Sequence, residues 1–103
     1  MSWETLVVGH FKLKEDIGED IAKKIISELE EVLECEIKYD DGYDEYEFED
    51  VNWVSHVRGD KIKEVVEKYK DYFVYFESSV FYLNEADENI SLSDGKIEAQ
   101  VFE

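Results

Sequence analysis

Residues 5–13, TLVVGHFKL, decide the fold, because both alternating faces of this segment are apolar over most of its length. A strand with one polar face lies at a surface, whereas a strand that is apolar on both faces is covered on one side and partly covered on the other. The segment therefore predicts a central strand, and the remaining elements are built outward from it.

A helix is predicted to follow this strand. Asp16 has the residue type of a helix N-cap, and Glu19 stands three positions later, which is the pattern of a capping box. Apolar residues then recur at helical spacing on one face, namely Ile17, Ile21, Ile25, Leu29 and Val32 or Leu33. We expect this helix to end near Glu34.

Turn signals and periodicity divide the rest of the chain. The pair Asp94 and Gly95 is the strongest hairpin signal, and a two-residue turn there makes the facing pairs apolar. These pairs are Leu92 with Ile97 and Ile90 with Ala99. The other predicted elements are strands at 36–39, from 45 onward and at 74–83, and a second helix opened by Gly59 and Asp60.

The strand that begins near Glu45 has an irregular apolar pattern. Tyr46 and Phe48 share one face, whereas Val51 and Trp53 fall on the other. A β-bulge near residues 49–50 would restore one apolar face, so we predict a bulge there.

This order of elements, β-α-β-β-α-β followed by a C-terminal β-hairpin, resembles the ferredoxin-like plan over roughly residues 4–83. The resemblance implies an α+β fold with an antiparallel sheet and two helices on one face. The other face stays open unless the hairpin or a second subunit covers it. Element order alone implies no activity. We expect a single domain that spans residues 1–103.

The negative charge is concentrated in one part of the chain. Residues 28–50 carry twelve carboxylates against one cation, Lys38, in a chain of net charge −17. Such a field disfavours nucleic acid and anionic membranes as partners and favours a basic protein surface. Neither a signal peptide nor a membrane span is readable near the N-terminus, so we expect a cytoplasmic protein.

Catalytic groups are scarce in this sequence. His10 and His56 are the only imidazoles, and no HxH or HxxxH spacing places both on one element. Cys35 is flanked by Glu34 and Glu36 at a helix exit, where its pKa should be raised and the thiol inert. We therefore predict no catalytic residue, no cofactor and no metal site, although two histidines beside a carboxylate would be the alternative.

The acidic turn at residues 40–45 invites a calcium interpretation, because hard cations take clustered oxygen ligands. The spacing of its carboxylates does not match the EF-hand loop. A solvated acidic turn explains the same residues, with a weak cation site as the alternative.

Glu45, Glu47 and Glu49 alternate along one strand, so their side chains should lie about 6.6 to 6.8 Å apart on one face. This spacing resembles that of successive phosphates, and aromatic side chains in between could anchor an interface. The predicted partner-binding residues are Glu30, Glu31, Glu34, Asp40, Asp41, Tyr43, Asp44, Glu45, Tyr46, Glu47, Glu49 and Asp50.

The sequence thus predicts a non-enzymatic inhibitor that mimics DNA or RNA toward a nucleic-acid-binding effector, as anti-CRISPR and anti-restriction proteins do. It would not bind nucleic acid directly, and it would be a monomer or a homodimer. One alternative is an immunity protein or antitoxin that caps a basic nuclease. Others are a small ligand- or metal-binding enzyme domain, an oligomer that pairs through the strand at 74–83, and a merely solvated acidic face.

Overall fold

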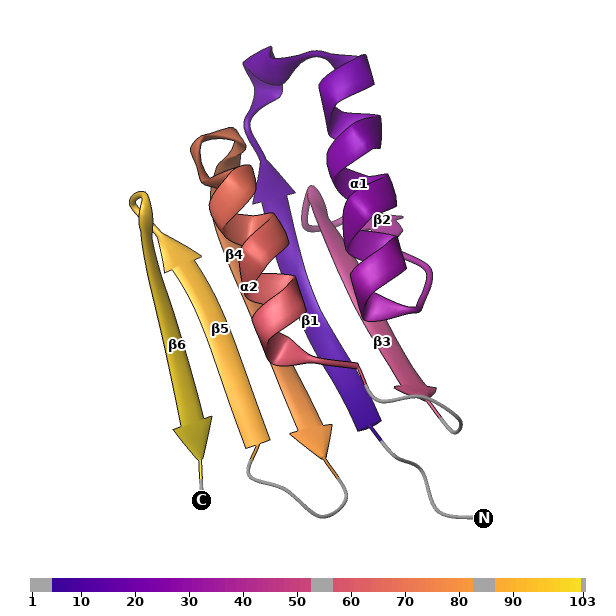
Figure 1. Ribbon diagram of the computed structural model, residues 1–103. Helices are drawn as coiled ribbons and strands as arrows, with labels where there is room; N and C mark the ends of the chain where they lie inside the picture. The colour runs from indigo at the N-terminus through magenta and orange to yellow at the C-terminus, as the bar shows by residue number, and fades with distance from the viewer. Residues whose placement is uncertain (1–4, 53–56, 83–86, 103) are drawn as a thin grey trace.

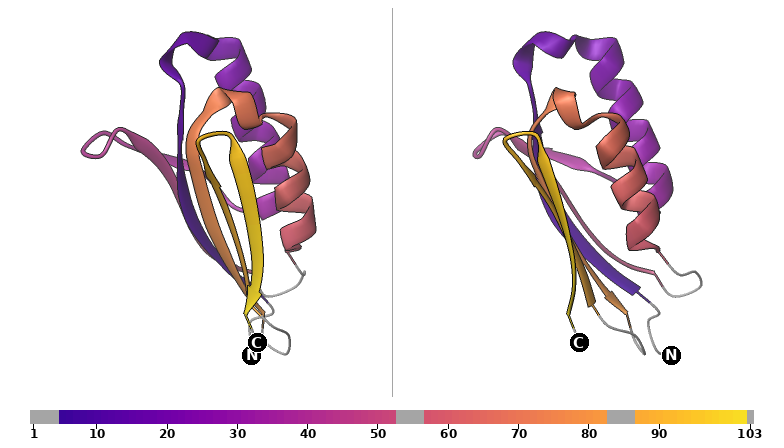
Figure 2. Two further views of the ribbon diagram at one scale, coloured as in Figure 1. Left: turned by 90° about the vertical axis from the view of Figure 1, so that its left-hand side faces the viewer. Right: turned by 60° about the vertical axis from the view of Figure 1, so that its left-hand side comes forward.

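The computed structural model describes residues 5–52, 57–82 and 87–102, and within them six strands form one antiparallel sheet in the order β2-β3-β1-β4-β5-β6. Two α-helices lie against the same face of this sheet (Figure 1 and Figure 2). The fold is therefore α+β, as predicted. Its elements are β1 Thr5–Leu13, η1 Glu15–Ile17, α1 Glu19–Leu33, β2 Lys38–Asp40, β3 Glu45–Asn52, α2 Gly59–Lys68, η2 Lys70–Tyr72, β4 Phe73–Tyr82, β5 Asp87–Ser93 and β6 Lys96–Phe102.

The predicted central strand is central in the sheet, because β1 pairs with β3 on one side and with β4 on the other. Its odd-numbered side chains Val7, Phe11 and Leu13 are buried in the core beneath the helices. The C-terminal hairpin of β5 and β6 continues the sheet beyond β4 and does not cover the opposite face (Figure 1). We call the helix-covered side the helix face and the other side the open face.

Aromatic rings fill the middle of the helix face. The Phe11 ring stacks on Tyr46 at 5.1 Å and on Phe76 at 5.8 Å between centroids, and it meets Phe73 edge-on at 5.6 Å. The apolar sides of both helices close over these rings with Ile25, Leu29, Leu33, Ile62, Val65 and Val66. Helical periodicity had indicated Ile25 and Leu29 of α1, with Val32 or Leu33 as the next position.

The predicted β-bulge in β3 is wrong. The pairing of β1 with β3 runs without a shift from Thr5 opposite Asn52 to Phe11 opposite Tyr46. Val51 needs no bulge, because it lies on the open face beside Leu6, whose other neighbour is Phe81. The irregularity of the sheet falls instead between β1 and β4, at Lys12 and Leu13.

The predicted helix start is also wrong. Asp16 lies inside the 3₁₀ turn η1, and α1 begins after Gly18, whose φ of 87° redirects the chain. No side-chain cap hydrogen bond is made at Gly18. A residue within a turn cannot take the extended conformation of an N-cap, so the capping box does not form.

The C-terminal hairpin follows its turn as predicted. Leu92 pairs with Ile97 and Ile90 with Ala99. Asp94 and Gly95 have φ angles of 53° and 76°, so both take the left-handed conformation of a type I′ turn.

No helix in the described residues has both the length and the apolar character needed to span a bilayer.

Candidate functional site

The open face carries the row of carboxylates that the sequence predicted. Phe48 points into the core from β3, so the alternating residues Glu45, Glu47 and Glu49 point to the open face. Glu47 and Glu49 are exposed, and Glu45 is half-buried. Consecutive members of this row are spaced by about 6.6 to 6.8 Å.

Across the strands, the row meets basic groups. Glu47 pairs with Lys38 of β2 on one side and with His10 of β1 on the other. His10 in turn pairs with Glu77 of β4, with 3.8 Å between Nε2 and the Glu77 carboxylate. Lys38 therefore places one positive charge beside Glu47, and His10 adds a second when it is protonated, whereas Glu45 faces another carboxylate, that of Asp40.

Glu45 and Asp44 already have partners within the protein. The Tyr75 hydroxyl donates to the Glu45 carboxylate, and this hydrogen bond raises the pKa of Tyr75 to about 12. The Tyr39 hydroxyl donates to Asp44, which also lies 3.2 Å from the Lys12 ammonium. These contacts lower the pKa of Asp44 and raise that of Tyr39 to about 12.

The turn between β2 and β3 is a polar projection with exposed rings. Asp40 Oδ1 accepts from the backbone N–H groups of Gly42, at 2.9 Å, and Tyr43, at 3.4 Å, as in an Asx-turn. Asp41 is exposed and the Tyr43 side chain is 77% exposed. Figure 2 shows this turn projecting away from the helices. Within the described residues, no three histidine, cysteine or acidic side chains converge as a metal site would require.

The other predicted acids lie on the helix side. Glu30 of α1 accepts from the Ile37 backbone N–H at 2.9 Å and so holds the loop after the helix. Glu31 is exposed on α1, and Glu34 ends the helix in the left-handed conformation. Asp50 shares the parity of Phe48 and points to the helix face. The structure therefore divides the twelve predicted residues between the two faces of the sheet and the turn.

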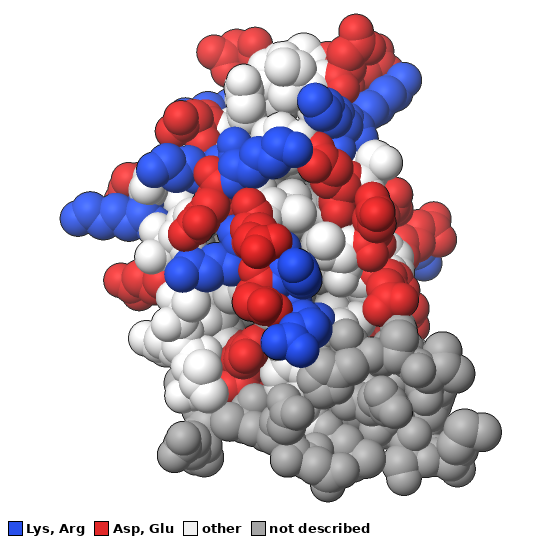
Figure 3. Space-filling model, in the orientation of Figure 1, with Lys and Arg blue, Asp and Glu red and all other residues white. Residues whose placement is uncertain are grey.

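The helix face itself carries charges of both signs. Figure 3 shows lysine and arginine side chains among the acidic ones across α2. Lys61 lies 3.7 Å from Glu64, Lys63 lies 3.8 Å from Glu67, and Lys68 crosses to Glu28 of α1 at 2.9 Å. Paired charges of this kind leave α2 without a single-sign field.

Cys35 behaves as the sequence predicted. Burial is the main cause that raises its pKa to about 11, and the carboxylates of Asp50 and Glu30 add to the effect. The thiol is therefore protonated at neutral pH and is a poor nucleophile. His56, the second predicted imidazole, lies outside the described residues, as does Trp53.

Sequence reasoning missed the residues of β4 that complete the open face. Tyr75, Glu77 and Phe81 share one parity of β4 and lie opposite Lys12, His10 and Leu6. Alternation along the segment 74–83 places these three residues on one face of the strand, but only the strand order brings that face beside the carboxylate row. An open hollow of about 360 Å³ follows the row, with Val8, His10, Lys38, Glu47 and Glu49 in its wall.

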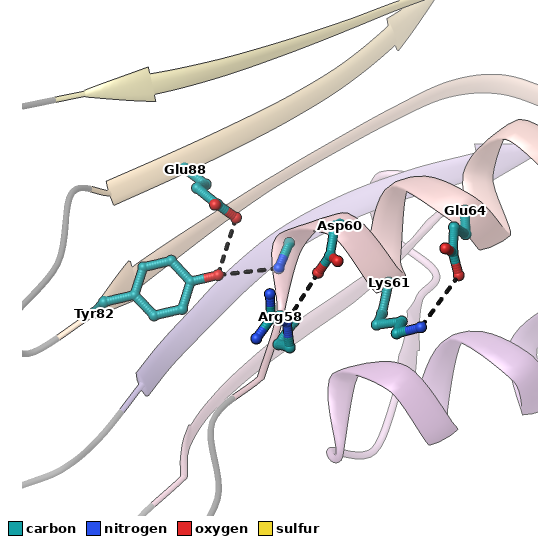
Figure 4. Close-up of polar contacts among 7 residues, drawn as sticks. Arg58, Asp60, Lys61, Glu64, Tyr82 and Glu88 are labelled. Carbon is teal, nitrogen blue, oxygen red and sulfur yellow. Dashed lines mark hydrogen bonds and ion pairs between the residues drawn. The ribbon is translucent and has the colours of Figure 1, made fainter.

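A second polar cluster lies at the start of α2 and supports the fold (Figure 4). The buried Tyr82 side chain accepts from the Gly59 backbone N–H at 3.0 Å and donates to Glu88 at 2.9 Å. Arg58 lies 3.2 Å from Asp60, and this hydrogen bond lowers the pKa of Asp60. The cluster ties the helix to β4 and β5.

Comparison of the chain with protein-family models, with curated proteins and with solved structures finds no match. The function is therefore argued from the open face and its charges.

Proposed function

We propose that this protein is a non-enzymatic binding protein that inhibits a nucleic-acid-binding protein by presenting carboxylates in place of phosphates, in the manner of anti-CRISPR and anti-restriction proteins. The observation that carries this proposal is the row of Glu45, Glu47 and Glu49 on a sheet face that no described helix covers. A rigid row of this kind can enter a groove of lysine and arginine and replace the counterions there.

The exposed members of the acidic region are the contact residues in this proposal. Glu47 and Glu49 lie in the row, and Asp41 and Tyr43 lie at the projecting turn. Glu45 and Asp44 accept hydrogen bonds from Tyr75 and Tyr39, so their role is to hold the face in shape. An exposed tyrosine beside carboxylates supports a protein partner, because aromatic side chains are enriched at interface hot spots.

The architecture that presents the face belongs to the same proposal. We propose that β1 to β4 and the two helices follow the ferredoxin-like plan, with the hairpin of β5 and β6 as an extension. The order β2-β3-β1-β4 with antiparallel neighbours supports it.

A charge-reversal experiment tests the acidic face. The variant carries Glu47→Lys and Glu49→Lys, and the matched control carries Glu64→Lys and Glu67→Lys on α2, which changes the net charge equally. We expect the first pair to weaken partner binding about 10- to 100-fold and the control to weaken it by less than about 3-fold, because only the first pair faces the partner's cations. Equal effects of the two pairs would contradict the assignment of this face.

The readout is a nucleic-acid mobility-shift assay. The protein is first tested alone, and then with a CRISPR effector, a restriction enzyme and a basic nuclease in turn. We expect no shift of the probe by the protein alone, because binding to a phosphate backbone requires exposed cations. We expect the protein to displace the nucleic-acid probe from one of the three targets. A direct shift by the protein alone would contradict mimicry.

The enzyme alternative rests on His10, which lies 3.8 Å from the Glu77 carboxylate. The double variant His10→Ala and His56→Ala should inhibit the target with a potency within a few fold of that of the unaltered protein. Removing a general acid or base typically costs at least about 10²-fold, so a loss of that size with retained circular dichroism would favour catalysis. Capture of the nuclease with loss of its cleavage would favour the immunity-protein alternative.

A further inference from the structure

The strand β6 forms one edge of the sheet along its full length. It pairs with β5 over every residue from Lys96 to Phe102, and in the described residues no element pairs with its other side. Figure 2 shows β6 as the front edge. The opposite edge strand, β2, is only three residues long. Brevity protects β2 from pairing with other chains, whereas β6 has neither a proline nor a register shift to protect it.

The hairpin turn determines which backbone groups of β6 point outward. A two-residue turn closes on a hydrogen-bonded pair, here Ser93 and Lys96, and the pairs of an antiparallel ladder then alternate. Ile97, Ala99 and Val101 therefore occupy the positions that are not hydrogen-bonded to β5. Their N–H and C=O groups point to the outer edge, ready to pair with another strand.

The side chains of these three residues form an apolar strip on the helix face of β6. Ile97 is half-buried against the core, Ala99 is exposed, and Val101 is 63% exposed. The helix α2 reaches β5, and a hollow of about 160 Å³ lies between Gly59, Lys63 and Ile90 on one side and Ala99 and Val101 of the strip on the other. In β6 the charges of Lys96 and Glu98 cancel, so this edge has no net charge.

We propose that two copies of this chain join through antiparallel pairing of β6 with β6, about a twofold axis at Ala99. The two sheets then form one continuous sheet, with the helices of both copies on the same side. This dimer uses a surface distinct from the carboxylate row, so it goes beyond the proposed function and leaves the open face available.

The side chains of β6 select this register. With the axis at Ala99, Ile97 lies opposite Val101 on the helix face, and Glu98 lies opposite Gln100 on the open face. An axis at Glu98 would instead place Glu98 opposite itself, in like-charge contact. An axis at Gln100 would lose the pairing of Ile97 with Val101. Among these three registers, the one at Ala99 pairs all three residues of both apolar strips and opposes no like charges.

The net charge of −17 gives this dimer a distinctive salt dependence. Two acidic copies repel each other, and salt screens that repulsion. Dimerisation should therefore tighten as NaCl rises from about 0.05 to 0.5 M, over which the Debye length shortens severalfold. Binding of the carboxylate row to a basic partner should weaken over the same range. The failure of one proposal is thus distinguishable from the failure of the other.

Sedimentation equilibrium of the full chain over a range of concentrations tests the dimer. The variant Ala99→Pro removes an outward N–H that β5 does not use, so the hairpin should remain. We expect the unaltered protein to dimerise and Ala99→Pro to weaken dimerisation at least about 10-fold. A second variant, Val101→Lys, places a charge on the apolar strip and should have the same effect while retaining every backbone group. Circular dichroism and the thermal midpoint report whether each variant is folded.

A matched pair of variants tests the register. Gln100→Lys places a lysine opposite Glu98 of the other copy, and Gln100→Glu places a carboxylate there. We expect the lysine variant to dimerise more tightly than the glutamate variant, by about 5- to 30-fold, because the twofold axis repeats the contact. The controls Ser27→Lys and Ser27→Glu make the same charge changes at an exposed position of α1.

Two results would overturn the proposal. One is a protein that stays monomeric at all concentrations at both low and high salt. The other is a dimer that folded Ala99→Pro and Val101→Lys variants leave unchanged. Equal responses of the Gln100 and Ser27 pairs would overturn the register at Ala99.

Discussion

The two faces of the sheet are made by alternate residues of the same strands, yet they differ in almost every property. On the helix face, Phe11, Phe48 and Phe76 pack together in a closed aromatic core. On the open face, one position along, His10, Glu47 and Glu77 form a row of polar and acidic side chains across the same strands. The helix face therefore stabilises this fold, while Glu47, Glu77 and His10 on the open face remain exposed to solvent.

The polar row across the open face is compatible with a stable sheet because Glu47 lies between Lys38 and His10 and not between two carboxylates. Lys38, Glu47, His10 and Glu77 follow one another from β2 to β4. Pairs of unlike charge across strands contribute roughly 0.2 to 1 kcal/mol, whereas a buried aromatic side chain contributes several. Substitutions at neighbouring positions of one strand should therefore lower the free energy of unfolding by different amounts, with the larger loss on the helix face.

The largest expected difference is between Phe11→Ala and His10→Ala. Removing the Phe11 ring leaves a cavity among four aromatic neighbours and should lower the free energy of unfolding by about 3 to 5 kcal/mol. Removing His10 should cost less than about 1 kcal/mol, because it loses an exposed pairing with Glu77 and an edge-on ring contact with Tyr75. Urea unfolding measures both values. Similar losses of unfolding free energy at Phe11 and His10 would contradict the proposed difference between the two faces.

Gly9→Ala tests how closely the helix face is packed. A Cβ atom at Gly9 would lie 2.6 Å from Phe48 Cζ and 2.8 Å from Ser78 Cα, and it would also clash with the Glu77 carbonyl oxygen. Overpacking of this kind should cost about 1 to 3 kcal/mol or more. In Gly42→Ala, the new Cβ would meet only Asp40 Oδ1, at 3.2 Å. That variant should unfold within about 0.5 kcal/mol of the unaltered protein in the same urea experiment.

Tyr82→Phe and Tyr75→Phe compare one hydroxyl from each face. Loss of the Tyr82 hydroxyl leaves the buried Gly59 N–H without its acceptor and should cost about 1 to 3 kcal/mol (Figure 4). Loss of the Tyr75 hydroxyl removes its hydrogen bond to the half-buried Glu45 on the open face, and should lower the free energy of unfolding by less than about 1 kcal/mol. Thermal unfolding monitored by circular dichroism ranks them. A larger loss in Tyr75→Phe would contradict the assignment.

The smallest expected effect is a pH dependence that comes from two tyrosines, Tyr75 on the open face and Tyr39 on β2. Hydrogen bonds to Glu45 and Asp44 raise the pKa values of Tyr75 and Tyr39 to about 12, above the value of about 10 in an unfolded chain. The folded protein therefore holds these protons longer, and stability falls as pH rises from about 10 to about 12. Tyrosinate absorbance measures the two ionisations. The double variant Tyr39→Phe and Tyr75→Phe should show a shallower loss of stability over that range.

Much of the fold was predictable because the signals are local. The spacing of Ile25 and Leu29 predicted the buried side of α1, and the turn at residues 94–95 predicted the register of the last hairpin. Within one helix or one short hairpin, backbone geometry links neighbouring residues directly. The bulge predicted at residues 49–50 was wrong because the face on which Val51 lies was inferred from its own strand alone. In the structure its apolar neighbour is Leu6 of β1, which lies far away in the sequence.

The candidate site was predictable only in its parts. Alternation placed Glu45, Glu47 and Glu49 on one face, but it did not reveal that Glu30 and Asp50 lie on the other side of the sheet. Neither did it reveal that Tyr75 and Glu77 complete the open face. The division follows from the position of α1 over one face, which no local pattern encodes.

By itself, the sequence determined the net charge, the buried sides of the helices and the geometry of the final turn. Each of these follows from residue identity and from spacing within a few positions. The tertiary structure alone decided which strands are neighbours, and hence that His10 lies between Glu47 and Glu77 and that β6 remains an edge. Strand pairing is selected by the summed burial and hydrogen bonding of segments far apart in the chain, and no single segment carries that information.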